Sequence, residues 1–175
     1  TNEDAKQLAE AGAEHGLLVV ADTQSGGKGR RGRSWQSEPE TTISMTLLCR
    51  PQFTAEKASM LTLVTGLAVA EAISELTGVS ASIKWPNDIL INDCKIGGIL
   101  IEKSEEGAYI IGVGINLISS PKLHSIYPAA SLHDFEIDIN RDDFLKLYLA
   151  AFDDNLLQSF TAIKNNFLAN AYKLH

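Results

Sequence analysis

Hydrophobic side chains recur every three or four residues in several stretches of the chain, the spacing that places them on one face of a helix. A short helix is predicted to start at Thr1-Asn2-Glu3-Asp4, where the Thr1 side chain is placed to cap the first turn. A long helix is predicted from Thr54 to about Leu76, with Gly78 ending it. Another helix is predicted over Arg141–Phe160, followed by a further helical segment that runs to the end of the chain.

Other stretches alternate hydrophobic and polar residues or are rich in β-branched residues, which predicts strands. These strands are Leu17–Thr23, Thr42–Cys49, Ala81–Trp85, Ile89–Ile91, Ile96–Glu102 and Tyr109–Leu117. Asn92-Asp93 and Glu105-Glu106-Gly107 are typical hairpin turns, so the later strands form a meander. The predicted class is α+β, with a mixed, mostly antiparallel sheet and helices on one face. No linker divides residues 1–175, which predicts one domain.

Composition excludes several classes of protein. A chain of 175 residues with 45% hydrophobic content can bury its own core as one domain. A formal charge of −7 disfavours a protein built to hold nucleic acid, which needs a broad excess of cations. Cys49 and Cys94 lack the spacing of a zinc site and are expected to be free thiols in the cytoplasm. No apolar run reaches the roughly 20 residues of a membrane span.

A basic loop interrupts this acidic chain between the first two strands. Lys28, Arg30, Arg31 and Arg33 are four of the chain's 15 basic residues, and the glycines among them let backbone amides approach a ligand. The segment formally matches the GxGxxG dinucleotide fingerprint, but no helix pattern starts at the loop, and no GxxxxGK[ST] phosphate loop is present either. An anion site is therefore indicated, with a solvated or RNA-contacting basic turn as the alternative. Trp35 directly afterwards is either a core residue or a cover for a purine ring.

Three later segments also depart from ordinary strand composition. Lys84-Trp85-Pro86-Asn87-Asp88 joins two strands and is either a functional segment or a simple turn with Trp85 in the core. Glycines interrupt two neighbouring strands at Gly97-Gly98 and at Gly112 and Gly114. A glycine inside a strand indicates close approach of a ligand or a bulge. Two such strands side by side predict a floor without side chains, on which a flat apolar ligand can lie.

Taken in order, these segments closely resemble biotin protein ligases over about residues 1–134. The resemblance is carried by Thr1-Asn2, Gln24, Gly27–Trp35, Lys84–Asp88, Lys95–Leu100 and Gly112–Asn116. It implies the fold shared with class II aminoacyl-tRNA synthetases, with the ligand on the open face of the sheet. It also implies that residues 1–175 are the catalytic core, without the strand that precedes it and the small C-terminal β-barrel that follows it in the family.

The resemblance further implies the site residues. Biotin or its carboxylate would contact Thr1, Asn2, Gln24, Lys28, Gly29, Arg30 and Lys95, over a floor of Gly98, Gly112 and Gly114. ATP or the adenylate would contact Arg30, Arg31, Arg33, Trp35, Lys84, Asn87 and Asn116. Lys28 stands where many members have Arg, which keeps the charge but loses the bidentate fork.

The implied reaction joins biotin to ATP as biotinyl-5′-AMP and then transfers biotin to a lysine of the biotin carboxyl carrier protein of acetyl-CoA carboxylase or a related carboxylase. Lys95, Arg30 and Lys28 with Mg²⁺ would neutralise the reacting anions. Asp88 is the candidate for orienting or deprotonating the carrier lysine, with a turn carboxylate as the alternative. No protein-bound metal site, nucleic acid or membrane partner is expected, and a homodimer is allowed.

Two rival functions remain open at this point. One is a lipoate ligase or octanoyltransferase on the same fold. The form of the basic loop distinguishes this chain from those families. The other is a module that only binds biotin or RNA. The two cationic segments beside the glycine floor argue against this module. Biotin-dependent exchange between ATP and pyrophosphate separates these rivals.

Overall fold

The computed structural model describes residues 1–36, 38–50, 58–120 and 128–172. In these ranges the chain forms a six-stranded sheet of order β1-β2-β6-β5-β4-β3, in which every neighbouring pair of strands is antiparallel. The strands are β1 (Leu18–Ala21), β2 (Thr42–Cys49), β3 (Ser82–Lys84), β4 (Asp88–Ile91), β5 (Cys94–Lys103) and β6 (Tyr109–Asn116). The helices are α1 (Asn2–Glu10), α3 (Leu61–Thr77), α4 (Arg141–Leu157) and α5 (Phe160–Asn170), with 3-10 turns η1 (Arg30–Gly32) and η2 (His133–Phe135).

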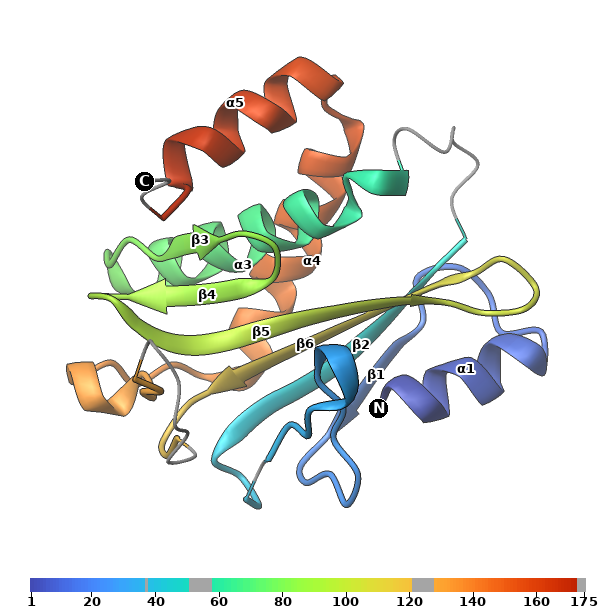
Figure 1. Cartoon of the computed structure of the whole chain (residues 1–175), viewed down its shortest axis with the longest axis horizontal. Coiled ribbons are helices and arrows are strands. Elements are labelled where there is room, and N and C mark those ends of the chain that lie inside the picture. The colour runs from blue at the N-terminus through green and yellow to red at the C-terminus, as the bar shows by residue number, and fades with distance from the viewer. Residues whose placement is uncertain (37, 51–57, 121–127, 173–175) are drawn as a thin grey trace.

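The hydrophobic core lies between one face of the sheet and the helices α3, α4 and α5 (Figure 1). Alternation in β2 sends Ile43, Met45 and Leu47 to this face, so the opposite face receives Ser44 and Thr46. The predicted α+β class and its helix-covered face are confirmed, while the pairs of strands that the structure describes are all antiparallel where a mixed, mostly antiparallel sheet was predicted. α1 is the exception, because it packs on the opposite face against Leu48 and Ile110 at one end of the sheet.

The ends of the elements show which local signals are reliable. Gly78 ends α3 with a φ of 70°, as predicted, whereas residues 54–57 of the predicted helix lie outside the described ranges. The predicted cap at Thr1 is wrong, since its side chain makes no capping hydrogen bond and its hydroxyl instead donates to Gln24 Oε1 at 3.1 Å. The predicted helix over residues 141–160 divides at Ser159, whose side chain caps α5. Among the described residues no helix is both long and apolar enough to cross a membrane.

Candidate active site

The open face of the sheet carries a pocket of about 1260 Å³, between the basic loop, the start of α1 and the segment that joins β3 to β4. Every residue assigned to the site from the sequence lines this pocket. These residues are Thr1, Asn2, Gln24, Lys28, Gly29, Arg30, Arg31, Arg33, Trp35, Lys84, Asn87, Asp88, Lys95, Gly98, Gly112, Gly114 and Asn116. The structure thus brings together segments that are far apart in sequence, while their individual roles stay predictions.

The glycine floor exists, and in this structure the protein's own side chains cover it. Gly98 lies directly opposite Gly114 across β5 and β6. A Cβ atom on Gly114 would lie 2.5 Å from Trp35 Cε2, and one on Gly98 would lie 3.5 Å from Trp35 Cζ3. A Cβ atom on Gly112 would lie 2.2 Å from Asn2 Oδ1. These glycines therefore admit Trp35 and Asn2 to the floor, and Trp35 is a pocket residue rather than a core residue.

A bulge brings Lys95 to the same side of the sheet as Gly98. Strand alternation alone would send residues three apart to opposite faces. The register between β4 and β5 shifts between Ile89 and Leu90, so Gly97 pairs with Ile89 while Lys95 pairs with Leu90. Consequently Lys95 and Gly98 both line the pocket, whereas a Cβ atom on Gly97 would meet Ile115 on the core side.

Lys95 is paired with the acidic residue of the neighbouring strand. Its Nζ lies 2.7 Å from Asp88 Oδ1, and both side chains are 25% exposed. The backbone of Lys95 is held from its other side by residues 128–130, because its amide donates to Pro128 O at 2.8 Å and its carbonyl accepts from Ala130 at 2.9 Å. Lys95 therefore presents its charge in the pocket from a fixed backbone.

The corner of the pocket beside α1 is a hydrogen-bond network. Gln24 Oε1 accepts from the backbone nitrogen and the hydroxyl of Thr1, and Gln24 Nε2 donates to Ser44 at 3.1 Å. Asn2 Oδ1 accepts from Thr46 at 2.7 Å, and Asn2 Nδ2 donates to Glu102 at 2.8 Å. These bonds fix which edge of each amide faces the pocket.

Glu102 also forms an ion pair with Lys6 at 2.7 Å. Burial opposes ionisation of Glu102, but the hydrogen bonds from Asn2 and Lys6 outweigh that effect and lower the pKa of its carboxyl below the ordinary value. Sequence analysis missed Ser44, Thr46 and Glu102. The polar residues that alternate with the core residues of β2 were the signal for the first two.

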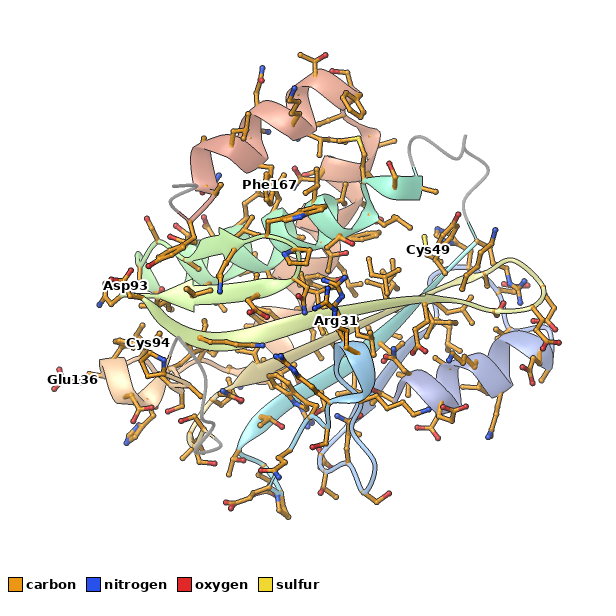
Figure 2. All side chains as sticks on the ribbon, in the orientation of Figure 1. Arg31, Cys49, Asp93, Cys94, Glu136 and Phe167 are labelled. Atoms are coloured by element: carbon orange, nitrogen blue, oxygen red, sulfur yellow. The ribbon has the colours of Figure 1, made fainter. Side chains whose placement is uncertain are left out.

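The basic loop folds back on itself over the pocket. The Trp35 amide donates to Gly27 O at 2.8 Å, and a Cβ atom on Gly27 would lie 2.2 Å from Trp35 O, so the close approach requires glycine. The turn at its tip places Arg31 at a φ of 56° and extends its side chain beside β5 (Figure 2). In the part of the chain that the structure describes, Arg31 and Arg33 form no ion pair, which leaves both charges available to an anion.

Two contacts tie this loop to other elements. Arg30 Nη1 donates to Asn87 Oδ1 at 3.3 Å, and Lys28 forms an exposed ion pair with Glu3. The contact with Lys28 lowers the pKa of the Glu3 carboxyl and raises that of the Lys28 ammonium. Lys28 is therefore already neutralised by Glu3, so a bound anion would compete with Glu3 for it.

The segment from Lys84 to Asp88 is more than a turn. Asn87 Nδ2 donates to Ile99 O at 3.2 Å and Asn87 O accepts from Ile99 N at 2.9 Å, which anchors the segment to β5. The alternative that placed Trp85 in the core is wrong, because the side chain is 57% exposed and packs in a T-shaped contact with the Phe167 ring, with centroids 6.3 Å apart. The segment therefore leaves Trp85 largely exposed at the rim of the pocket, which Asn87 and Asp88 also line.

Asn116 offers an unused acceptor to the pocket. The residue is 2% exposed, and its Nδ2 donates to Ala130 O at 3.0 Å. Its Oδ1 is buried without a hydrogen-bond partner among the described residues. Because buried polar atoms are rarely left unpaired, a ligand group that donates a hydrogen bond is indicated here.

Residues 1–116 match the model of the biotin/lipoate A/B protein ligase family. The chain belongs to this family. Its relatives in the family include the biotin–[acetyl-CoA-carboxylase] ligase of Paracoccus denitrificans, which is 35% identical over 99% of this chain and 78% of that protein. The bifunctional ligase/repressor BirA of Bacillus subtilis is 43% identical over 69% of this chain, but the aligned part covers only 38% of that protein.

Two solved structures of biotin protein ligases match nearly all of this chain. Biotin protein ligase from Leishmania major, in complex with biotin, matches 100% of this chain and 80% of its own at 26% identity, with a TM-score of 0.87. Biotin protein ligase from Aquifex aeolicus, in complex with biotin and ATP, matches 97% of this chain and 75% of its own at 31% identity, with a TM-score of 0.83. The resemblance to biotin protein ligases and the fold that it implied are therefore confirmed.

Proposed function

We propose that this chain is an ATP-dependent biotin–[acetyl-CoA-carboxylase] ligase core, which forms biotinyl-5′-AMP and transfers biotin to a lysine of a biotin carboxyl carrier protein. The observation that carries the proposal is the convergence of Lys95, Arg30 and the floor of Gly98 and Gly114 in one pocket. A cationic wall beside a floor without side chains suits a ligand with an apolar ring system and a carboxylate. The relatives named above act on biotin, which supports the same assignment.

In the first step, a carboxylate oxygen of biotin attacks the α-phosphorus of ATP, and the bond to pyrophosphate breaks. Two anions approach each other only if cations neutralise them. Lys95 and Arg30 both line the pocket and would do so, joined by Lys28 after it leaves Glu3. Mg²⁺ would enter with ATP as part of the substrate, bound mainly by phosphate oxygens.

The nucleoside would occupy the part of the pocket between Trp35 and Asn116. The buried Oδ1 of Asn116 is an acceptor, so it suits the exocyclic amine of adenine and opposes the carbonyl of guanine. Arg31, Arg33 and Lys84 line the same pocket and would hold phosphates. Trp35 would shift from the glycine floor as biotin takes its place.

In the second step, the amine of a carrier lysine attacks the acyl carbon of biotinyl-5′-AMP, and AMP leaves. Most of that amine is protonated near neutral pH, since the ordinary pKa of lysine is about 10.4. Asp88 would orient the amine or accept its proton, for which it must release Lys95. The acceptor would be the carrier domain of acetyl-CoA carboxylase or a related carboxylase, in the cytoplasm, and the ligase would act as a monomer or a homodimer.

The test is exchange of radiolabelled pyrophosphate into ATP, with and without biotin. Exchange that requires biotin supports the proposal. Exchange that responds instead to lipoate or octanoate would assign the chain to the other branch of the family. Biotin binding without any exchange would leave a binding module and overturn the proposed reaction.

A further inference from the structure

One carboxylate outside the pocket holds a backbone segment that supports two pocket residues. Asp134 Oδ2 accepts hydrogen bonds from the backbone amide of Ser131 at 2.7 Å and from its hydroxyl at 2.8 Å. Ser131 is fully buried, whereas Asp134 is exposed. The two bonds lower the pKa of the Asp134 carboxyl, so it is ionised near neutral pH. A buried amide thus depends on a single exposed side chain.

The segment that Ser131 belongs to is joined to both β5 and β6. Ala130 N donates to Lys95 O at 2.9 Å, and Leu132 N donates to Asn116 O at 2.9 Å. Ala130 O also accepts the side-chain amide of Asn116 at 3.0 Å. Ser131 lies between Ala130 and Leu132, and its amide shares a peptide plane with the carbonyl of Ala130. The hydrogen bond from this amide to Asp134 therefore determines where the carbonyl of Ala130 points.

That carbonyl decides which way the Asn116 amide faces. While Ala130 O accepts from Nδ2, the buried Oδ1 atom is the edge of the amide left for a ligand, at a residue that lines the pocket. If Ala130 O moved away, the amide could rotate by half a turn and present its donor edge instead. An acceptor edge selects adenine and a donor edge selects guanine, because the two bases differ in donor and acceptor at that position.

We propose that Asp134 is a positioning residue for nucleotide selectivity. Through Ser131 and Ala130 it locks the Asn116 amide so that only its acceptor edge meets the base. This inference rests on the proposed function, because it assigns a nucleotide to the pocket. Such a lock matters because a binding site discriminates strongly between analogues only when its polar groups cannot adapt to the wrong one.

The experiment compares the wild type with Asp134→Ala in the biotin-dependent exchange assay, using ATP and then GTP. The KM for ATP should rise about tenfold, the preference for ATP over GTP should fall by about the same factor, and the KM for biotin should change little. Asp134→Asn keeps an acceptor oxygen and should restore most of the preference. Asp138→Ala is the matched control, since this exposed carboxylate in the same loop contacts His133 and does not touch Ser131.

Ser131→Ala is a second, milder variant for the case in which Asp134→Ala does not fold. It removes the hydroxyl of Ser131 but leaves the amide bonded to Asp134. It should lower the preference for ATP about threefold. An unchanged preference for ATP over GTP in a folded Asp134→Ala protein overturns the inference. An equal rise in the KM for ATP and the KM for biotin overturns it as well. If Asp134→Ala does not fold, an unchanged preference in Ser131→Ala overturns it. Absence of biotin-dependent exchange in the wild type would instead contradict the proposed function itself.

Discussion

Lys95 and Asp88 form an ion pair of 2.7 Å inside the pocket, across neighbouring strands. The bulge in β5 makes the pair, because it brings Lys95 to the pocket side of the sheet. Lys95 is proposed to act in adenylate formation and Asp88 in transfer. Each residue neutralises the other until a ligand separates them. Substitution of Lys95 therefore tests adenylate formation, and substitution of Asp88 tests transfer.

Lys95→Ala should abolish adenylate formation and leave the fold intact. The loss should be on the order of a hundredfold or more, because the variant removes a cation that faces the reacting anions. Quantifying biotinyl-5′-AMP by chromatography checks the rate, and circular dichroism checks the fold. Lys146→Ala is the control, since Lys146 lies on α4 in an exposed pair with Asp143. Equal adenylate yields from Lys95→Ala and wild type would show that Lys95 does not act on the reacting groups.

Asp88→Asn should affect transfer more than activation. The variant keeps the size of the side chain but cannot accept a proton, so transfer from preformed biotinyl-5′-AMP to a carrier should slow by about a hundredfold. Adenylate formation should fall by less than tenfold. The measurement is single-turnover labelling of a carrier domain. If both steps slow equally, Asp88 serves only to place Lys95.

Gly114→Ala should weaken biotin binding through the basic loop. The added methyl group would lie 2.5 Å from Trp35 Cε2, closer than any carbon contact, so the indole must leave the floor. The methyl group also fills part of the surface proposed for biotin. Calorimetry should show affinity reduced by about tenfold or more, while thermal unfolding shifts little because the glycine faces the pocket. Unchanged affinity would show that biotin binds elsewhere.

Glu102→Gln should lower stability in a way that depends on pH. The folded pKa of Glu102 lies below its ordinary value of about 4.3. Its ionised form therefore stabilises the fold above that pH, and the contribution is lost as the pH falls through the folded pKa. Denaturant titration should show a loss of about 1 kcal/mol at pH 7 that shrinks below about pH 4. Glu75→Gln, an exposed position on α3, should show no such dependence. If the free energy of unfolding of Glu102→Gln differs from that of the wild type by the same amount at pH 7 and below about pH 4, the charge of Glu102 does not contribute to stability.

Strong local patterns predicted the fold well. The strand over Thr42–Cys49 was placed at its true bounds, because hydrophobic residues that face the core alternate with buried polar residues that bond to Gln24 and Asn2 on the other face. The turn at Asn92-Asp93 was also predicted correctly, since both residues adopt a positive φ. The sequence likewise placed every assigned residue in one pocket, but it did so through the resemblance, because each motif alone had an ordinary structural explanation.

Features that depend on long-range contacts could not be predicted. The bulge beside Leu90 depends on pairing between two strands, and no residue type marks it. Thr1 carried a capping signal, yet Gln24, distant in sequence, competed for its hydroxyl. Trp85 was assigned to the core as the alternative because hydrophobicity alone does not tell whether a side chain of the segment faces inward or outward.

The contact between Arg30 and Asn87 joins the basic loop to the segment between β3 and β4. Arg30 Nη1 donates to Asn87 Oδ1 at 3.3 Å, and a guanidinium has further N–H donors that can bind a ligand. A guanidinium can bridge an anion and the protein through several donors at once, which a small residue cannot do. Arg30 is therefore placed to keep the mixed anhydride beneath the loop.

Arg30→Gly should release biotinyl-5′-AMP rather than prevent its formation. The intermediate is an activated acyl donor, so an enzyme that loses it would label nearby lysines in place of its carrier. We expect the dissociation rate of the adenylate to rise by about a hundredfold, which corresponds to the loss of one or two charge-assisted hydrogen bonds. The catalytic step should slow less than this. Stopped-flow measurement of the dissociation rate and mass spectrometry of labelled bystander proteins check both parts. Arg141→Gly removes a guanidinium that pairs with Asp22 instead and serves as the control. An unchanged dissociation rate, with labelling still confined to the carrier, would show that Arg30 does not hold the intermediate.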